Sequence, residues 1–311
     1  MHPLTGGTGR PSLAVMALVL NALVWGISWW PLRELQVHGL HPLWSTVLIY
    51  LLASIGVLVW KPQAWRGVLQ HRGLLLLLVA SGLTNVGFNW AVTVGDVVRV
   101  VLLFYLMPAW SVLMAWVLLN EKPSTGSLLR LALALAGVVI VLKSPGSPWP
   151  VPASIADWLA LMGGLCFALT NVLLRKHGQT PTESRMLAMF GGGAIMASVA
   201  AWAGMSAQIV PAPAIAVAGV PAALGLCLAF LLGNMALQYG AARLAASTTA
   251  LVMLTEILFA SASSAWLDAA EFSTRTLAGG SLIVLAALLA ALAPEAPDKT
   301  PAKAPAKAPA P

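Results

Sequence analysis

Charge is scarce in this sequence. Only 9% of its 311 residues are Asp, Glu, Lys or Arg, whereas 59% are hydrophobic. A soluble domain usually carries charge on roughly a quarter of its residues, because it needs a hydrated surface around its core. The composition therefore excludes an ordinary soluble enzyme or binding domain.

Residues that enzyme and metal sites commonly use are also few or poorly placed. The two cysteines, Cys166 and Cys227, have no disulfide or metal-binding spacing and fall inside apolar stretches. The five histidines fall in expected loops or chain ends, which argues against a metal site or a Ser–His pair at membrane depth. No G-x-x-x-x-G-K-(S/T) loop is present for ATP binding. We therefore expect no catalytic residues, no metal and no cofactor.

Long apolar stretches fill most of the chain. Each is long enough to cross a hydrocarbon core of about 30 Å as a helix. The expected helices cover residues 13–31, 43–60, 73–93, 98–119, 127–143, 155–175, 184–203, 217–238, 244–266 and 276–293. The sequence thus predicts an all-α membrane protein with ten transmembrane helices.

The distribution of basic residues predicts the orientation. If the N-terminus is cytoplasmic, 13 of the 17 Lys and Arg residues fall on the cytoplasmic side. This bias places both termini in the cytoplasm and the protein in the inner (plasma) membrane. The basic residues are scattered over several loops, so a nucleic-acid partner is not expected.

Three short motifs recur in the same order in the second half of the chain. N-W-A-V-T-V-G at 89–95 matches N-M-A-L-Q-Y-G at 234–240, S-T-G-S-L at 124–128 matches S-T-R-T-L at 273–277, and S-W-W-P-L-R at 28–33 matches T-N-V-L-L-R at 170–175. The offsets are 145, 149 and 142 residues. Each half has an odd number of expected helices, so the second copy must enter the membrane upside down, as in many secondary transporters.

The duplication predicts two inverted five-helix repeats and fixes the expected boundaries of the chain's parts. These are a cytoplasmic N-terminal segment at 1–12, a first repeat at 13–143, a linker at 144–154, a second repeat at 155–293 and a Pro/Ala/Lys tail at 294–311. The tail has a low-complexity composition and is expected to be disordered and cytoplasmic.

Several of these features occur together in one known group of proteins. Trp25-Gly26-x-Ser28 lies in the first helix, Pro108 in the fourth helix precedes Glu121, and Glu256 in the ninth helix precedes Glu271. The sequence resembles the drug/metabolite transporter superfamily, in its ten-helix form with two EamA-like repeats, and most resembles the aromatic amino-acid exporters of the YddG type. The resemblance implies a secondary transporter that exports small organic solutes, with aromatic or apolar amino acids as the first candidates. The expected partners are this small-molecule substrate and the lipid bilayer, and the expected oligomeric state is a monomer.

Polar side chains within spans are costly in hydrocarbon and often mark a binding site. Aromatic side chains suit apolar cargo and attract ammonium groups. The candidate residues lining a substrate cavity are Trp29, Asn85, Asn89, Tyr105, Trp110, Asn171, Asn234, Gln238 and Glu256. For each aromatic residue, packing or lipid contact is the alternative. Asn89 and Asn234 are repeat mates, with interhelical hydrogen bonding as their alternative role.

Three further residues have alternative interpretations. Glu256 is the acid nearest the middle of a span, and it can hold a substrate ammonium, carry a coupling proton, or serve as a structural hydrogen-bonding group. Arg99 is close to Asp96, which favours a local ion pair over binding of a substrate carboxylate. Pro108 interrupts its helix and acts either as a gate hinge or as a fixed bend.

Other function classes are less compatible with these residues. An exporter of drugs or quaternary cations is the alternative within transporters, and it depends on Glu256. A membrane-embedded enzyme needs a cluster of acid, base or nucleophile at membrane depth, and a wide passive channel needs more polar residues in each helix. Neither pattern is present.

Overall fold

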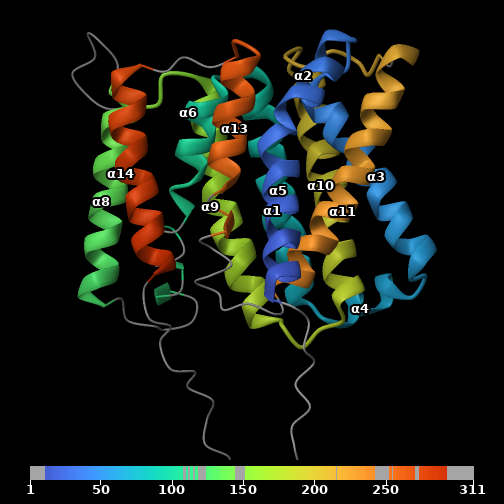
Figure 1. Cartoon of the computed structure of the whole chain (residues 1–311). Coiled ribbons are helices and arrows are strands. Elements are labelled where there is room, and N and C mark those ends of the chain that lie inside the picture. The colour runs from blue at the N-terminus through green and yellow to red at the C-terminus, as the bar shows by residue number, and fades with distance from the viewer. Residues whose placement is uncertain are drawn as a thin grey trace, which may run out of the picture.

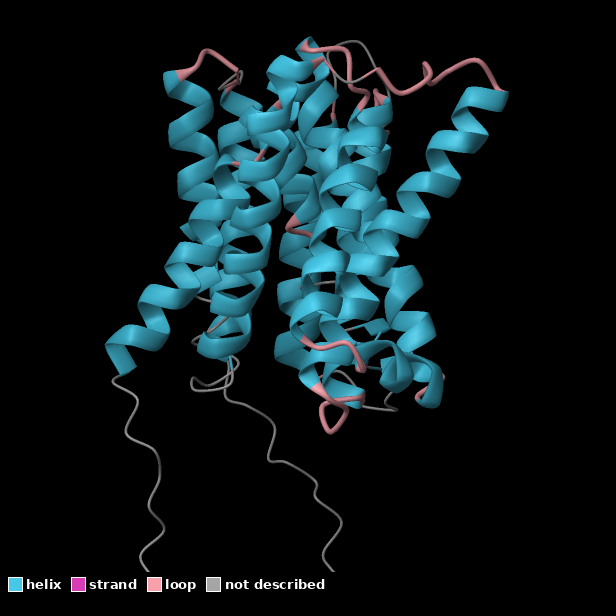
Figure 2. Ribbon diagram, turned by 90° about the vertical axis from the view of Figure 1, so that its right-hand side faces the viewer, coloured by secondary structure: helices cyan, strands magenta, loops and turns pink. Residues whose placement is uncertain are grey.

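The protein folds as a bundle of helices, here in a computed structural model. The structure describes residues 11–107, 110, 113–114, 116–117, 124–143, 151–214, 216–241, 252–253, 255–269 and 273–292. Over these residues it contains helices and no strands (Figures 1 and 2). The prediction of an all-α protein is confirmed for this part of the chain.

The helices follow one another with short connections. Their bounds are α1 Pro11–Ile27, α2 Trp29–Val37, α3 Pro42–Trp60, α4 Ala64–Gln70, α5 Gly73–Val94, α6 Val97–Phe104, α8 Thr125–Leu142, α9 Ile155–Lys176, α10 Thr182–Ser206, η1 Val217–Gly219, α11 Val220–Ala241, α13 Thr255–Trp266 and α14 Thr274–Ala291. The short helix α4 falls between two expected spans and was not predicted. The chain enters α1 and leaves α14 at the same end of the bundle (Figure 1).

Six helical segments are long and apolar enough to cross a membrane. They are Leu13–Val37, Pro42–Trp60, Gly73–Val94, Ile155–Leu174, Thr182–Ser206 and Val217–Leu237, and Leu128–Val141 and Thr274–Ala286 are shorter apolar helices. The other two expected spans are 98–119 and 244–266. The structure describes α6 at the start of the first and α13 at the end of the second. Residues 1–10, 144–150 and 293–311 lie outside the described residues, so the expected N-terminal segment, most of the linker and the tail stay predictions.

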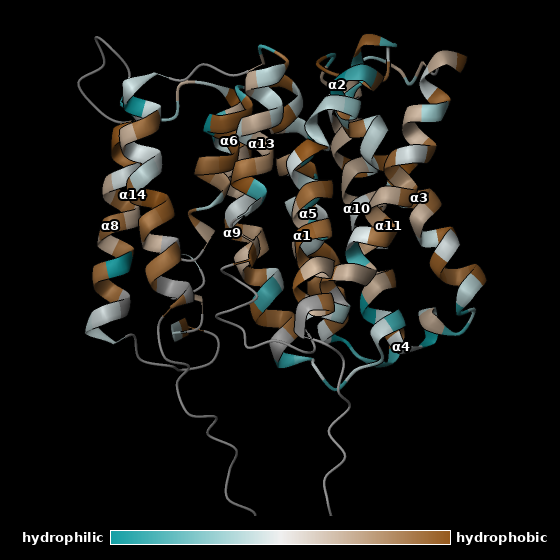
Figure 3. Ribbon diagram, in the orientation of Figure 1, coloured by the Kyte–Doolittle hydropathy of each residue, from teal (hydrophilic) through white to brown (hydrophobic). Residues whose placement is uncertain are grey.

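The helices are built largely of hydrophobic residues (Figure 3), and many large apolar side chains are exposed on them. On α11, for example, Leu224, Leu228 and Leu232 form an exposed stripe at four-residue spacing. A helix in water would place charged and polar side chains on that face. An apolar outer face is what a helix bundle needs when lipid surrounds it.

The first expected helix is longer than predicted and is interrupted. It was expected at 13–31, but helical structure continues to Val37 with a break at Ser28. The Ser28 backbone N–H and hydroxyl both donate to the Trp25 carbonyl, at 3.2 and 2.8 Å. This side-chain bond to the preceding turn competes with the regular helical ladder. Pro31, four residues after Ile27, has no N–H to donate to the Ile27 carbonyl, so the ladder is interrupted between α1 and α2.

Several of the contacts between helices occur in matched pairs. Helix α1 packs against α11 and α13, and α9 packs in the same way against α5 and α6; likewise α3 packs on α11 as α5 does on α10. Helices α3 and α10 pack together, as do α8 and α14. Exchanging each of these helices for the one that the predicted duplication pairs with it reproduces these contacts.

Glycines allow the closest approaches between helices. Where α8 crosses α14, a Cβ on Gly137 would lie 2.6 Å from the Gly279 carbonyl oxygen, and a Cβ on Gly279 would lie 2.6 Å from the Gly137 carbonyl oxygen. The side chain of any other residue would force the two backbones apart. The reciprocal contact is another feature shared by the two halves.

Candidate substrate site

Helices α6 and α13, one from each half of the chain, meet through a pair of buried polar side chains. Tyr105 follows the last residue of α6, and Glu256 lies in the first turn of α13. The Tyr105 hydroxyl lies 2.9 Å from Glu256 Oε2 and 3.0 Å from the Met253 carbonyl oxygen. Tyr105 is 2% exposed and Glu256 6% exposed. Two of the predicted site residues are therefore in direct contact.

The position of Tyr105 follows from the end of α6. Residues 98–119 were expected to form one helix. Instead, Tyr105 and Leu106 form a turn, in which the Leu106 N–H donates to the Leu103 carbonyl. Pro108, four residues after Phe104, has no N–H to donate to the Phe104 carbonyl. That carbonyl faces α9, where a Cβ on Gly164 would lie 2.6 Å from it. Pro108 itself lies outside the described residues, so its role as a hinge stays a prediction.

A third polar side chain, Asn21 of α1, reaches the same region. Its Nδ2 donates to Met253 Sδ at 3.4 Å. Its Oδ1 has no hydrogen-bond partner among the described residues, although Asn21 is only 1% exposed. An unpaired buried carbonyl oxygen is costly, so Asn21 is a polar group without its full set of partners.

The Trp25-Gly26-x-Ser28 motif holds α1 against α13 beside this region. A Cβ on Gly26 would lie 2.9 Å from the Glu256 carbonyl oxygen and 2.7 Å from Phe259 Cβ. Only glycine permits so close an approach. The motif therefore sets the distance between α1 and the helix that carries Glu256.

Aromatic rings form a continuous series through the bundle. Trp25 stacks on Phe230 with centroids 4.7 Å apart, and Phe88 and Phe104 meet at 4.9 Å. Neighbouring rings in the series are within 6.3 Å of each other. In order, with Phe167 as a branch at Phe104, the series is Phe190, Tyr50, Phe230, Trp25, Phe88, Phe104 and Tyr105. It ends at Tyr105, next to Glu256.

Asn85 and Asn89 lie at the interface of α5 with α3. Asn85 Oδ1 accepts a hydrogen bond from the Tyr50 hydroxyl at 2.7 Å, and Asn89 Nδ2 donates to Thr46 Oγ1 at 3.2 Å. Asn89 is fully buried, and its Oδ1 has no partner among the described residues. Each asparagine thus makes an interhelical hydrogen bond, which for Asn89 is the alternative that the sequence offered to lining a cavity.

Trp29 and Arg33 of α2 connect three helices. Trp29 Nε1 donates to Ser263 Oγ of α13 at 3.0 Å, and the Arg33 guanidinium lies 5.0 Å from the Trp29 ring. Arg33 also donates to the carbonyls of Val92 and Gly95 at the end of α5. The Trp29 side chain is only 3% exposed, and these partners hold it in place.

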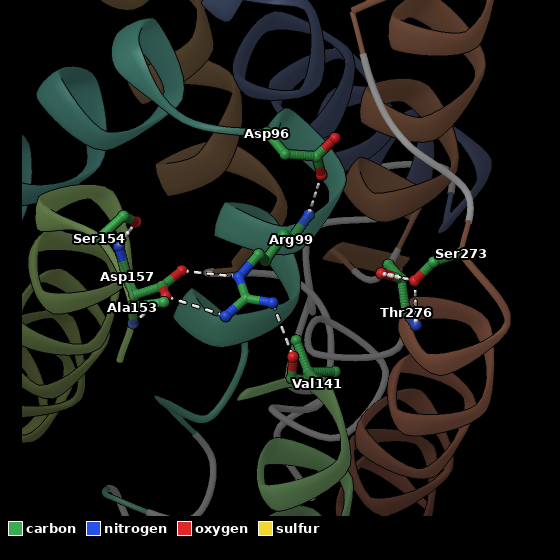
Figure 4. A network of polar contacts seen from close by, with 8 residues as sticks. All are labelled: Asp96, Arg99, Val141, Ala153, Ser154, Asp157, Ser273 and Thr276. Atoms are coloured by element: carbon green, nitrogen blue, oxygen red, sulfur yellow. Dashed lines mark hydrogen bonds and ion pairs between the residues drawn. The ribbon is translucent and has the colours of Figure 1, made fainter. Parts of the chain in front are cut away.

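Arg99 forms an ion pair, but not with the residue expected. Its guanidinium bonds Asp157 of α9 through Nε–Oδ1 at 2.7 Å and Nη2–Oδ2 at 2.9 Å (Figure 4). Asp96 instead caps α6 by accepting the Arg99 backbone N–H at 2.7 Å. Sequence reasoning missed Asp157, whose position as an acid in the first turn of an apolar helix was the available signal.

The remaining predicted residues are more dispersed. Asn171 on α9 is exposed, whereas Asn234 on α11 and Trp110 are half-buried. The Trp110 Nε1 atom is buried without a hydrogen-bond partner among the described residues. The Gln238 side chain lies outside the described part of the chain. The structure therefore joins Tyr105 to Glu256, and the cavity role of the other residues stays a prediction.

Comparisons with known proteins bear on the first half of the chain and on the fold as a whole. Residues 12–143 match the EamA-like transporter family. This EamA-like segment runs from α1 to α8. A curated relative, the uncharacterized transporter YojE of Bacillus subtilis (strain 168), is 28% identical over 144 residues. That match covers 43% of this chain and 48% of the relative, so the chain spans about half the length of the relative that it matches.

A solved crystal structure extends the likeness beyond the EamA-like segment. It aligns with 90% of this chain and 96% of its own chain, with a TM-score of 0.56 and 19% sequence identity. At that identity the likeness concerns the fold. The same arrangement of helices therefore occurs in another protein over both halves of the chain.

Proposed function

We propose that this protein is a secondary transporter that moves small organic solutes across the membrane by alternating access. The observation that carries the proposal is the contact of Tyr105 with Glu256, because it places a buried acid between α6 of the first half and α13 of the second. The matched helix contacts support two inverted repeats that rock about this contact. The EamA-like match of residues 12–143 supports a transporter rather than an enzyme.

The proposed transporter lies in the inner membrane, with both termini in the cytoplasm, and works as an exporter. The excess of basic residues on the expected cytoplasmic side supports this orientation. The α2 end of the bundle then faces outward. We propose Pro108 as the gate hinge, because it follows in sequence the turn that ends α6.

The family resemblance supports aromatic or apolar amino acids as cargo. Glu256 supports a second class, cationic drugs or other organic cations, because a buried carboxylate attracts positive charge. Asn89, Asn234 and Gln238 are proposed to line the path together with the aromatic residues. The protein is proposed to act as a monomer.

Counterflow in liposomes tests the transporter proposal. Vesicles containing the purified full-length protein are loaded with excess unlabelled solute, and uptake of labelled solute is followed with and without a pH gradient. A carrier gives transient accumulation of the label, which empty vesicles do not show. Absence of counterflow across a panel of amino acids and organic amines would contradict the proposal. A conductance in electrical recordings would instead indicate a channel.

A further inference from the structure

The Tyr105 hydroxyl lies within hydrogen-bonding distance of two acceptors, although it has only one proton to donate. Glu256 Oε2 is 2.9 Å away and the Met253 carbonyl oxygen is 3.0 Å away. A phenolic hydroxyl can donate to only one of them at a time. The two oxygens therefore converge on a point that suits a donor with several N–H or O–H groups.

A primary ammonium group has the donors that this point needs. It carries three N–H bonds and a positive charge, so it can donate to both oxygens and neutralise the Glu256 carboxylate. Among the described residues Glu256 has no basic ion-pair partner; the ion pairs there are Arg99–Asp157 and His38–Glu34. Asn21 reaches Met253 through its Nδ2, which donates to the sulfur at 3.4 Å, whereas its buried Oδ1 lies toward Gly233 of α11 and has no partner among the described residues.

Among the described residues, no comparable site for a carboxylate accompanies it. The partly buried arginines of the described residues are Arg33, Arg99, Arg130 and Arg185. Arg130 and Arg185 lie within the first two turns of α8 and α10, and Arg185 donates to the Gly178 carbonyl and to Thr182 Oγ1. Arg33 is bound to the end of α5, and Arg99 is bound to Asp157 and to the Val141 carbonyl. A carboxylate in the bundle would therefore have to displace one of these bonds.

We propose that Glu256 and the Met253 carbonyl form a binding site for a primary ammonium group, and that the Tyr105 hydroxyl occupies this site when cargo is absent. The aromatic series that ends at Tyr105 suits an apolar or aromatic body on the cargo. The favoured cargo is thus a primary amine, in preference to a zwitterionic amino acid or a quaternary cation without N–H groups. This assignment rests on the proposed transporter function.

Binding would then require Tyr105 to leave Glu256. Because this hydrogen bond joins α6 to α13, its replacement by cargo loosens the contact between the two halves. Cargo binding and helix movement are coupled through the same bond. Removing the hydroxyl removes a competitor, so it should strengthen amine binding.

Four probes of similar size test the assignment by equilibrium dialysis with the purified full-length protein. Phenethylamine carries only the ammonium, phenylalanine carries both charges, phenylpropionate carries only the carboxylate, and trimethylphenethylammonium keeps the charge without N–H groups. Phenethylamine is expected to bind tightest and phenylpropionate weakest. Equal affinities for phenethylamine and phenylpropionate, or for phenethylamine and its trimethylated form, would overturn the proposal without any variant.

Two substitutions with matched controls sharpen the test. Glu256→Gln is expected to weaken phenethylamine binding by roughly ten- to a hundredfold, whereas Glu34→Gln at the exposed end of α2 leaves it unchanged. Tyr105→Phe is expected to strengthen it by up to about tenfold, whereas Tyr50→Phe, which removes the hydroxyl of another buried tyrosine, gives no such gain. Gel filtration and melting curves establish that each variant is folded.

The results separate this inference from the transporter proposal. If Glu256→Gln keeps full counterflow of phenylalanine, and the unaltered protein shows no preference for phenethylamine, the ammonium site is overturned. The transporter proposal then still stands. The expected order of probe binding without counterflow of any solute would support the site and overturn transport. Weaker phenethylamine binding in Tyr105→Phe than in the unaltered protein would contradict the role of the hydroxyl.

Discussion

The three consecutive glycines of α10 allow a test of the close helix packing with an internal control. A Cβ on Gly192 would lie 2.0 Å from the Leu78 carbonyl oxygen of α5, whereas a Cβ on its neighbour Gly191 would have no atom within 4 Å. Ordinary carbon–oxygen contacts are more than 1 Å longer than the first distance. Gly192→Ala must therefore push α5 and α10 apart, and Gly191→Ala needs no adjustment.

The size of the effect follows from the comparison of the two variants. Both replace a helical glycine by alanine and gain about the same helix propensity, roughly 1 kcal/mol in soluble helices. This gain cancels in the difference between them. What remains is the overpacking at Gly192, which costs about 1 to 3 kcal/mol. At about 2 to 4 °C for each kcal/mol, Gly192→Ala should melt several degrees below Gly191→Ala.

The protein's own thiols provide the assay. Cys227 is buried and Cys166 half-buried, so a thiol-reactive fluorescent dye reports unfolding of the detergent-solubilised protein as the temperature rises. Gly192→Ala is expected to react at a lower temperature than the unaltered protein, and Gly191→Ala at the same or a higher temperature. Equal melting of the two variants would refute the close approach of α5 and α10 at this glycine.

Three other predictions concern the ion pair, the orientation and a cap. Asp157→Asn should lower stability by roughly 3 kcal/mol, because it leaves the Arg99 guanidinium without its buried partner; an unchanged melting temperature would contradict this. In a cysteine-free background, Val37→Cys should react with an impermeant maleimide added outside right-side-out vesicles and Leu69→Cys should not, and the reverse result would overturn the proposed orientation. Burial lowers the pKa of His41, whose Nδ1 accepts the Leu43 N–H at the start of α3, so the unfolded chain binds the proton first and stability should fall as the pH drops below about 6.5. His41→Asn should weaken that pH dependence, and a dependence as steep as before would exclude His41 as its source.

The helix positions were predictable because apolar length is a strong signal. The expected starts and ends of the third and sixth helices differ from α5 and α9 by no more than one residue. The break at Ser28 was not predicted, because Val24 to Trp30 is apolar enough to continue as one helix, although Pro31 was an available signal. The break combines the missing N–H of Pro31 with the bond from the Ser28 hydroxyl to the Trp25 carbonyl, and hydropathy detects neither.

Sequence reasoning was weaker for pairs of residues than for single residues. Glu256 and Tyr105 were each selected as candidate site residues, one as a buried acid and the other as an aromatic, but nothing in the sequence linked residues 151 positions apart. For the same reason Arg99 was assigned to the nearby Asp96 rather than to Asp157. Neighbours in sequence are visible in a pattern, whereas contacts between distant helices depend on how the bundle packs.

Three arginines lie at the α2 end of the bundle, which the proposed orientation places outside the cytoplasm. Their contacts explain how basic residues are accommodated on the side where few are expected. Arg33 donates to carbonyls at the end of α5, Arg99 to the Val141 carbonyl in the last turn of α8, and Arg275 to the Lys143 carbonyl just after α8. The last carbonyls of a helix lack partners within it and carry partial negative charge, so a guanidinium satisfies both needs. These three charges are used within the structure. Under the proposed orientation, the cytoplasmic excess of basic residues is therefore carried by residues other than these three arginines. A substrate carboxylate would have to displace an existing bond to pair with any of the three.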